Sequence, residues 1–149
     1  MNQKLQSLLN GVEEDVTILS LSAAFLYHEL LNVNWLGFYC MKKDYLTLGP
    51  FQGLPACIKI PLGKGACGRV AQSKAPLIIP DVRLEANYIA CHTETQSELV
   101  LPILVKHELF AVLDIDSLSL NRFNEQDQMH LMACCHTIAT ALQKNQMKS

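Results

Sequence analysis

The sequence is poor in charged residues and has no concentrated basic segment. Charged side chains make up 17% of its 149 residues, and the formal net charge is −2, whereas a typical globular domain carries about 25% charged residues. Proteins that bind nucleic acid through its phosphates need a clustered positive face, so this class is disfavoured. The low charge is compatible with a surface that is partly buried in an oligomer.

Long apolar runs are also missing. The longest extends from Ile18 to Leu26 and is broken by serines, whereas a transmembrane helix needs about 20 apolar residues. The N-terminus lacks the basic segment, apolar core and small-residue cleavage site of a signal peptide. We therefore expect a soluble, cytoplasmic protein. Half of residues 1–149 are hydrophobic, which is enough to form the core of a single domain.

The six cysteines lack the spacings of a zinc site. No Cys-x-x-Cys pair occurs, and Cys134-Cys135-His136 cannot jointly face one ion, because adjacent helical residues point about 100° apart. We expect no metal. Three other cysteines, Cys57, Cys67 and Cys91, stand in short segments rich in small residues. Thiol redox chemistry needs one cysteine that attacks and another that resolves the product, and this chain supplies both.

Apolar residues recur at helical spacing near both ends of the chain. From Val12 to Leu31 the intervals alternate between four and three residues, which predicts one helix whose buried face is formed by Val12, Val16, Leu19, Ala23, Leu26 and Leu30. Near the C-terminus, Asn124 and Asp127 have the spacing of a reciprocal helix cap. The helix that follows places Cys135 in the core, on a buried face formed by Leu131, Cys135, Ile138 and Leu142.

Between these helices the hydrophobic period changes to two, which is typical of strands. Tight turns are predicted at Lys42-Lys43-Asp44 and Lys106-His107, and Pro102 indicates an edge or a bulge. The order of elements predicts an α+β domain: an antiparallel sheet with the N- and C-terminal helices on one face and a ligand pocket on the other. The predicted strands, with one short helix at Gly65 to Gln72, are Val33 to Met41, Tyr45 to Leu48, Cys57 to Ile60, Ser97 to Val105 and Glu108 to Asp116.

Alternation within the last strand separates two faces of the sheet. Leu113 and Ile115 should pack on the helices, which turns Asp114 and Asp116 to the opposite face. Two carboxylates on an apolar strand are costly unless they bind something. They lie about 6.5 Å apart along the strand, close enough for one carboxyl to have a raised pKa and stay neutral. The alternative is a solvated strand end that caps a turn at Ser117.

A glycine-rich segment, Gly63-Lys64-Gly65-Ala66-Cys67-Gly68, matches the dinucleotide motif G-x-G-x-x-G. The match is weak, because the surrounding elements are hairpins and not a parallel βαβ unit. A glycine-rich turn into a helix has a simpler consequence here. The N-terminus of a helix carries a partial positive charge, which predicts a lowered pKa and a stabilised thiolate for Cys67.

Taken together, these segments resemble the free methionine-(R)-sulfoxide reductases, a family built on a GAF domain. The resemblance covers most of the chain from Asn34 to the last helix, in order. It includes a trio of cysteines that GAF domains with a purely ligand-binding role lack. The segments that carry it are Asn34 to Tyr39, Leu48 to Gly53, Pro55 to Cys57, Gly63 to Gly68, Ile89 to Cys91, Ser97 to Val100, Val112 to Ser117 and Arg122-Phe123.

The resemblance implies that the chain reduces free L-methionine (R)-S-oxide to L-methionine. It places the catalytic cysteine on Cys91, which would become a sulfenic acid, and the recycling cysteines on Cys67 and Cys57, with an intramolecular disulfide as the product. Thioredoxin would reduce that disulfide. The resemblance implies a homodimer and no metal or organic cofactor. It places the residues that contact the substrate on Trp35, Tyr39, Glu98, Asp114 and Asp116.

These residues suggest how the reaction would proceed. A neutral carboxyl among Asp114, Asp116 and Glu98 would protonate the leaving oxygen, and an ionised neighbour would hold the ammonium group of the substrate. The rings of Trp35 and Tyr39 would form an apolar wall against the methyl-sulfur end. Ordinary core packing is the alternative for both rings.

The chain departs from the family pattern at three positions. His92 follows the catalytic cysteine where an acidic residue is usual, and Ala111 and Arg69 replace a glycine and a small residue. The imidazole of His92 would alter the reactivity of the neighbouring nucleophile. The order in which the two recycling cysteines act stays open, although its position at a helix start favours Cys67 over Cys57.

Two other classes of function fit parts of the sequence. A GAF sensor would bind a ligand without chemistry, and the segment 121–125 is similar to a motif of cyclic-nucleotide GAF domains, although we interpret it as a strand-to-helix corner. A thiol-based switch would regulate a partner protein. Steady turnover with an external reductant distinguishes the enzyme from both.

Overall fold

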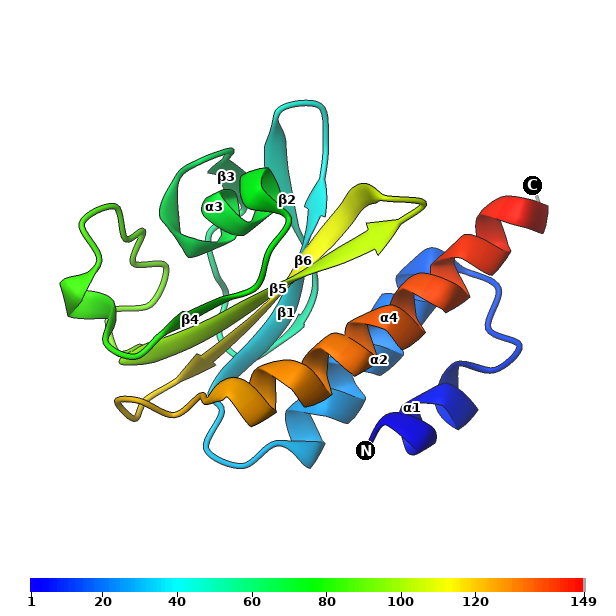
Figure 1. The fold of residues 1–149 in the computed structure, drawn as a ribbon, viewed down its shortest axis with the longest axis horizontal. Coiled ribbons are helices and arrows are strands. Elements are labelled where there is room, and N and C mark those ends of the chain that lie inside the picture. Colours follow the sequence, from blue (N-terminus) through cyan, green and yellow to red (C-terminus); the bar gives the residue numbers. More distant parts are fainter. Residues whose placement is uncertain (149) are drawn as a thin grey trace.

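The computed structural model describes residues 1–148 and confirms the α+β class (Figure 1). Its centre is one antiparallel sheet with the strand order β3-β2-β1-β6-β5-β4. The strands are β1 (Trp35–Met41), β2 (Tyr45–Gln52), β3 (Lys59–Pro61), β4 (Leu77–Ile79), β5 (Ser97–Val105) and β6 (Glu108–Ser117). The helices are α1 (Asn2–Leu9), α2 (Asp15–Glu29), α3 (Gly65–Ser73), the 3₁₀ helix η1 (Val82–Leu84) and α4 (Glu125–Lys148).

The terminal helices cover one face of the sheet, as predicted. Figure 1 shows α1, α2 and α4 gathered on the same side. The alternating residues of the central strands meet these helices in one buried cluster, which contains Leu36, Phe38, Leu113 and Ile115. The cysteine of α4 assigned to the core, Cys135, is buried in this cluster. The helix formers and strand formers therefore place their apolar faces where the periodicity indicates.

The helix predicted from Val12 to Leu31 is shorter in the structure, where α2 spans Asp15–Glu29, and its buried face differs in part from the prediction. Val12 lies in the connection between α1 and α2, and Val16 is 63% exposed, so placing Val16 on the buried face is wrong. The helix turns a neighbouring face to the sheet, which buries Ile18, Leu19, Ser22, Ala23 and Leu26. No helix formed by residues 1–148 is both long and apolar enough to cross a bilayer.

The start of α4 confirms the predicted reciprocal cap. The backbone amide of Asp127 donates to Oδ1 of Asn124, and the amide of Asn124 donates to Oδ2 of Asp127, each at 2.9 Å. These two bonds satisfy amides that a helix end leaves without intrahelical partners. The guanidinium of Arg122 joins this corner to the end of α2 by donating to the carbonyl of Leu31 at 2.9 Å and to Asp127 at 3.3 Å.

A tight turn sets the pairing of the two longest strands. Lys106 and His107 both have positive φ angles, 52° and 68°, which is the conformation of a two-residue type I′ hairpin. From this turn the register passes through a shift of one residue between Ile103 and Leu104 and then continues to the pairs Glu98↔Asp116 and Val100↔Asp114. Pro102 lies beyond the three residues of β5 that pair with β4, so it occupies an edge, as predicted.

The second face of the sheet is not free of helices, contrary to the prediction. The short helix α3 packs there with residues of β1, β5 and β6. Gly68 allows α3 to lie close to the end of β3, because a Cβ atom at its position would lie 2.5 Å from the carbonyl oxygen of Pro61. Gly63 and Gly65 have positive φ angles, which the tight connection from β3 to α3 requires. The strands around this connection pair antiparallel, so the parallel βαβ unit of a dinucleotide site does not surround it.

The boundaries on this side also differ from the prediction. β2 continues to Gln52, and β3 begins at Lys59, which leaves Cys57 in the loop between them. β4 and η1 were not predicted, and they lead into an irregular segment, residues 85–96, that returns the chain to β5. The segments that carry Cys57 and Cys91 thus both lie outside regular secondary structure, on the same face of the sheet as α3.

Candidate active site

Three carboxyl groups meet on the face that carries α3. Glu98 on β5 lies opposite Asp116 on β6, and Asp114 is two residues further along β6. Their side chains point away from the helical core because their strand neighbours Leu113 and Ile115 point into it. Glu98, Asp114 and Asp116 are only 5%, 6% and 5% exposed. The alternative of a solvated strand end is therefore wrong.

Burial raises the pKa of all three carboxyl groups, as predicted for at least one of them. For Glu98 and Asp116 the increase is large, because desolvation is reinforced by repulsion from Asp114. The pKa of Asp114 is also raised by desolvation, but hydrogen bonds from Glu98, Asp116 and Cys67 stabilise its carboxylate. Burial thus favours the protonated forms of Glu98 and Asp116, while the hydrogen bonds to Asp114 favour its carboxylate.

Each of these residues has an oxygen without a hydrogen-bond partner among residues 1–148: Glu98 Oε1, Asp114 Oδ1 and Asp116 Oδ1. Buried polar atoms in folded proteins are normally paired. All three residues line one pocket, so these oxygens are available to a molecule bound there.

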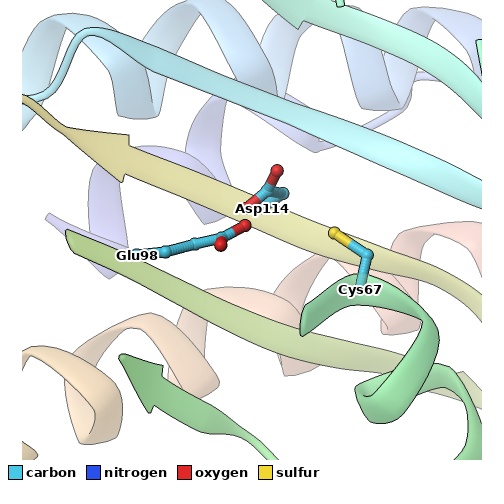
Figure 2. Close-up of side chains that lie close together, drawn as sticks. All are labelled: Cys67, Glu98 and Asp114. Atoms are coloured by element: carbon cyan, nitrogen blue, oxygen red, sulfur yellow. The ribbon is translucent and has the colours of Figure 1, made fainter. Parts of the chain in front are cut away.

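Cys67 joins the carboxyl cluster from the first turn of α3. Figure 2 shows its thiol pointing toward Asp114, with Glu98 on the neighbouring strand. The sulfur of Cys67, one carboxyl oxygen of Glu98 and one of Asp114 all lie within 4.8 Å of one another. Burial and the facing carboxylates raise the pKa of Cys67 well above its usual value. The predicted lowering is wrong, because desolvation and negative neighbours outweigh the helix end.

Among residues 1–148, the side chains of Cys67, Glu98 and Asp114 lie close enough together to hold one metal ion. A thiol and two carboxylates are donors that Zn²⁺ accepts. Such ligands must lose their protons to bind, and the raised pKa values of Cys67 and Glu98 oppose that loss. The cluster is better suited to sharing and donating protons.

A disulfide joins Cys57 to Cys91 across 34 residues of sequence, with the Cα atoms 5.3 Å apart. Cys91 lines the pocket, Cys57 lies outside its lining, and both are half-buried. Cys67 is a free, buried thiol. The structure thus pairs Cys91 with Cys57, and the order in which Cys57 and Cys67 act stays a prediction. The surface loop of Cys57 meets the segment of Cys91, whereas Cys67 is enclosed among the carboxyl groups.

Two aromatic residues of β1 hold the loop that carries Cys57. Trp35 Nε1 donates to the carbonyl of Leu54 and the hydroxyl of Tyr39 donates to the carbonyl of Cys57, both at 2.9 Å. The two rings stack with centroids 6.0 Å apart, and Trp35 also stacks on Phe51 at 5.5 Å. Tyr39 lines the pocket. Trp35 is buried against the ring of Tyr39 and supports the loop that carries Cys57.

Sequence reasoning missed four polar residues of the pocket wall: Lys64, Tyr88, His92 and Thr95. His92 was noted for its position but given no place in the pocket. Nε2 of His92 and Oγ1 of Thr95 are buried without a hydrogen-bond partner within the described chain. Burial and the nearby carboxylates raise the pKa of Tyr88. The available signal was a run of polar residues around Cys91, in a segment without periodicity.

The enclosed space is small. The lining residues come from β1, β3, β5, β6, the start of α3 and the segment 88–95, and they leave a cavity of about 20 Å³. That is room for about one water molecule. With Cys57 and Cys91 joined, the pocket is closed to anything as large as an amino acid.

Comparisons with known proteins agree with this geometry. Residues 9–142 match the GAF domain family. The chain is 40% identical to the free methionine-R-sulfoxide reductase of Escherichia coli strain K12 over 131 residues, which cover 88% of this chain and 79% of that protein.

Solved structures show the same similarity. The X-ray structure of free methionine-R-sulfoxide reductase from Neisseria meningitidis in complex with its substrate matches with a TM-score of 0.95 and 30% identity, covering 99% of this chain and 89% of that one. The reduced form of fRMsr of Staphylococcus aureus matches with a TM-score of 0.92 and 38% identity, covering 95% and 92%. The chain therefore belongs to the GAF domain family and, within it, to the free methionine-R-sulfoxide reductases.

Proposed function

We propose that this chain reduces free methionine (R)-sulfoxide to methionine, with Cys91 as the nucleophile. The observation that carries the proposal is the position of Cys91, which lines the pocket of the buried carboxyl cluster and is bonded to a second cysteine, Cys57. A nucleophilic sulfur and a source of protons thus border the same small space. A sensor that only binds a ligand has no need for either.

The first step forms a bond to sulfur and transfers oxygen. The Cys91 thiolate attacks the sulfoxide sulfur while Glu98 or Asp116, whose pKa is raised by burial and by Asp114, protonates the sulfoxide oxygen. One thiolate, one sulfoxide and one proton give methionine and a sulfenic acid on Cys91. Asp114, the carboxylate of the cluster, favours a cationic group nearby and is suited to hold the substrate's ammonium group.

The second step returns the enzyme to a disulfide. The thiol of Cys57 attacks the sulfenic acid of Cys91, the sulfur–oxygen bond breaks, and water leaves. The Cys57–Cys91 pairing in the structure supports this order. An external dithiol, which we propose is thioredoxin, then regenerates both thiols. The cycle requires no metal or organic cofactor.

The enclosure of the pocket favours a free amino acid over a peptide once reduction of the disulfide admits the substrate. Its walls close around the carboxyl cluster from several elements, so the two chain neighbours of a methionine in a peptide would collide with them. A homodimer, which the family resemblance implies, stays a prediction. A cytoplasmic location and a single GAF domain over residues 1–149, which were expected from the sequence, also stay predictions.

Incubation of the reduced protein with free methionine (R)-sulfoxide and dithiothreitol tests the proposal. Methionine should accumulate over many turnovers, and titration without reductant should show loss of two thiols per methionine released. A binding-only sensor would release no methionine. A regulatory thiol switch would stop after a stoichiometric reaction even with reductant present.

Single-turnover measurements separate the two recycling cysteines. Without reductant, reduced Cys57→Ser and Cys67→Ser should each release about one methionine per chain, because neither residue makes the first attack. Cys67→Ser should then form the disulfide with Cys91, whereas Cys57→Ser should stop at the sulfenic acid, detectable by a dimedone adduct. Loss of the first turnover in either variant would assign the attack to that cysteine.

The closed pocket predicts that substrate binds only after reduction. The oxidised protein should show no binding of methionine or its (R)-sulfoxide by calorimetry, because its cavity holds about one water molecule. Cys57→Ser, which cannot form this disulfide, should bind methionine under oxidising and reducing conditions alike. Equal affinity of the oxidised and reduced wild type would contradict this prediction.

A further inference from the structure

The two sulfurs of the disulfide face different surroundings. Cys91 borders the pocket, whose interior holds about 20 Å³, whereas Cys57 is absent from the pocket lining and lies in the loop between β2 and β3. A protein thiolate that attacked from the pocket side would have to enter a space with room for one water molecule. Leu54, Pro55 and Ile58, which flank Cys57 in this loop, are exposed, so the loop offers a surface that a much larger reactant can contact.

The loop around Cys57 exposes apolar side chains. Leu54 is 68% exposed and Ile58 is 76% exposed, and Pro55 between them is also exposed. We call Leu54, Pro55 and Ile58 the Cys57 collar. Exposed apolar side chains grouped around a functional atom are characteristic of a contact surface for another protein.

The collar is held in place by its backbone. The carbonyl oxygens of Leu54 and Cys57 accept hydrogen bonds from Trp35 and Tyr39 at 2.9 Å, and that of Ile58 accepts one from the amide of Leu48 at 3.0 Å. The side chains are thus exposed on a fixed loop. A fixed surface loses little conformational freedom when a partner binds.

We propose that the external dithiol protein docks on the Cys57 collar and attacks the sulfur of Cys57, not that of Cys91. The inference rests on the proposed function. It identifies the partner as a protein whose reactive cysteine is surrounded by apolar residues, because only such a surface is complementary to Leu54, Pro55 and Ile58.

The chemistry of this step is balanced. The partner's thiolate forms a bond to Cys57, the Cys57–Cys91 bond breaks, and Cys91 leaves as a thiolate beside the pocket. The partner's second thiol then attacks the mixed disulfide, releases Cys57 as a thiolate, and leaves the partner oxidised by two electrons. Attack at Cys57 frees Cys91 first, which is the cysteine that the next substrate needs.

Kinetics with two reductants test the docking surface. With thioredoxin as the probe, the double variant Leu54→Glu/Ile58→Glu should lose at least about 10-fold in kcat/KM for thioredoxin, since two charges replace the apolar contact. Turnover with dithiothreitol should stay within about 2-fold of wild type. A matched control, Leu31→Glu/Met129→Glu, changes two equally exposed apolar residues outside the loop and should behave as wild type with both reductants.

Trapping identifies the attacked sulfur. Oxidised wild type is mixed with thioredoxin whose second active-site cysteine is replaced by serine, and the cross-linked peptide is identified by mass spectrometry. We expect the mixed disulfide at Cys57, and a cross-link at Cys91 would overturn the proposal. Unchanged thioredoxin kinetics in the collar variant would also overturn it. Absence of methionine with dithiothreitol would instead refute the proposed function, which the trapping experiment does not use.

Discussion

Replacing Cys91 by serine should lower methionine formation from free methionine (R)-sulfoxide by more than about 1000-fold, with dithiothreitol as the reductant. Removal of a catalytic nucleophile typically costs several orders of magnitude, and a serine hydroxyl is a far weaker nucleophile toward sulfur than a thiolate. Cys67 cannot readily substitute, because burial and the adjacent carboxylates raise its pKa well above the usual value. Methionine is quantified by chromatography after a fixed time.

The control for this variant is another cysteine outside the pocket. Cys40 is a free, half-buried thiol of β1, and Cys40→Ala should retain activity within about 2-fold. Both variants should have near-wild-type circular dichroism when reduced. Substantial activity in Cys91→Ser would remove Cys91 from the role of nucleophile and leave Cys67 and Cys57 as the remaining candidates.

Asp116→Asn should slow the reaction by about 100-fold or more while leaving the chain folded. A positioned proton donor contributes about 10²–10⁴-fold to a rate, and the amide cannot donate its proton to the sulfoxide oxygen as a carboxylic acid does. The pKa of Asp116 is raised well above its usual value by burial and by Asp114. The wild-type rate should therefore fall as the pH rises toward that raised pKa and the donor ionises.

The raised pKa of Asp116 also predicts how the stability of the protein depends on pH, and it predicts that Asp116→Asn is more stable than the wild type at high pH. A carboxyl whose pKa is higher in the folded than in the unfolded chain binds more protons when folded. Its contribution to stability is therefore complete below the unfolded pKa of about 4 and is lost as the pH rises through the folded pKa. Asp116→Asn removes one such group, so its thermal midpoint should exceed that of wild type at pH 8 and converge with it at pH 4.

Thermal melts of both proteins between pH 4 and pH 9 provide the measurement. Glu98→Gln is a matched variant, because Glu98 lies opposite Asp116 and has the same direction of pKa shift for the same cause. A melt in which Asp116→Asn unfolds at all pH values would mean that the carboxyl stabilises the fold. It would then have to be assigned a structural role.

The sheet faces could be predicted because alternation is a local property of a strand. Leu113 and Ile115 are apolar and Asp114 and Asp116 are not, and the pleat alone separates them. The cap of α4 was predictable for the same reason, since Asn124 and its partner lie three residues apart. Both patterns depend on neighbours in sequence, and the resemblance to a known family then connected them to a function.

The pairing of cysteines and the pKa of Cys67 depend on distant segments. The helix-end argument considered the residues next to Cys67, but the structure places Asp114 and Glu98 against it. Burial and these two groups reverse the sign of the shift. The partner of Cys91 likewise depends on where an irregular segment returns to the sheet, which no period encodes.

The register of β5 and β6 links the fold to the chemistry. A shift of one residue between these strands would place Glu98 of β5 on the opposite face from Asp114 and Asp116 of β6, so that either Glu98 or the two aspartates would enter the apolar core beneath the terminal helices. Ionisable groups there would have neither water nor partners, at a cost of several kcal/mol each. The three carboxyl groups therefore disfavour a shifted pairing of β5 with β6 during folding. Substitution of all three by apolar residues should remove this free-energy cost and allow hairpins with the shifted register to persist.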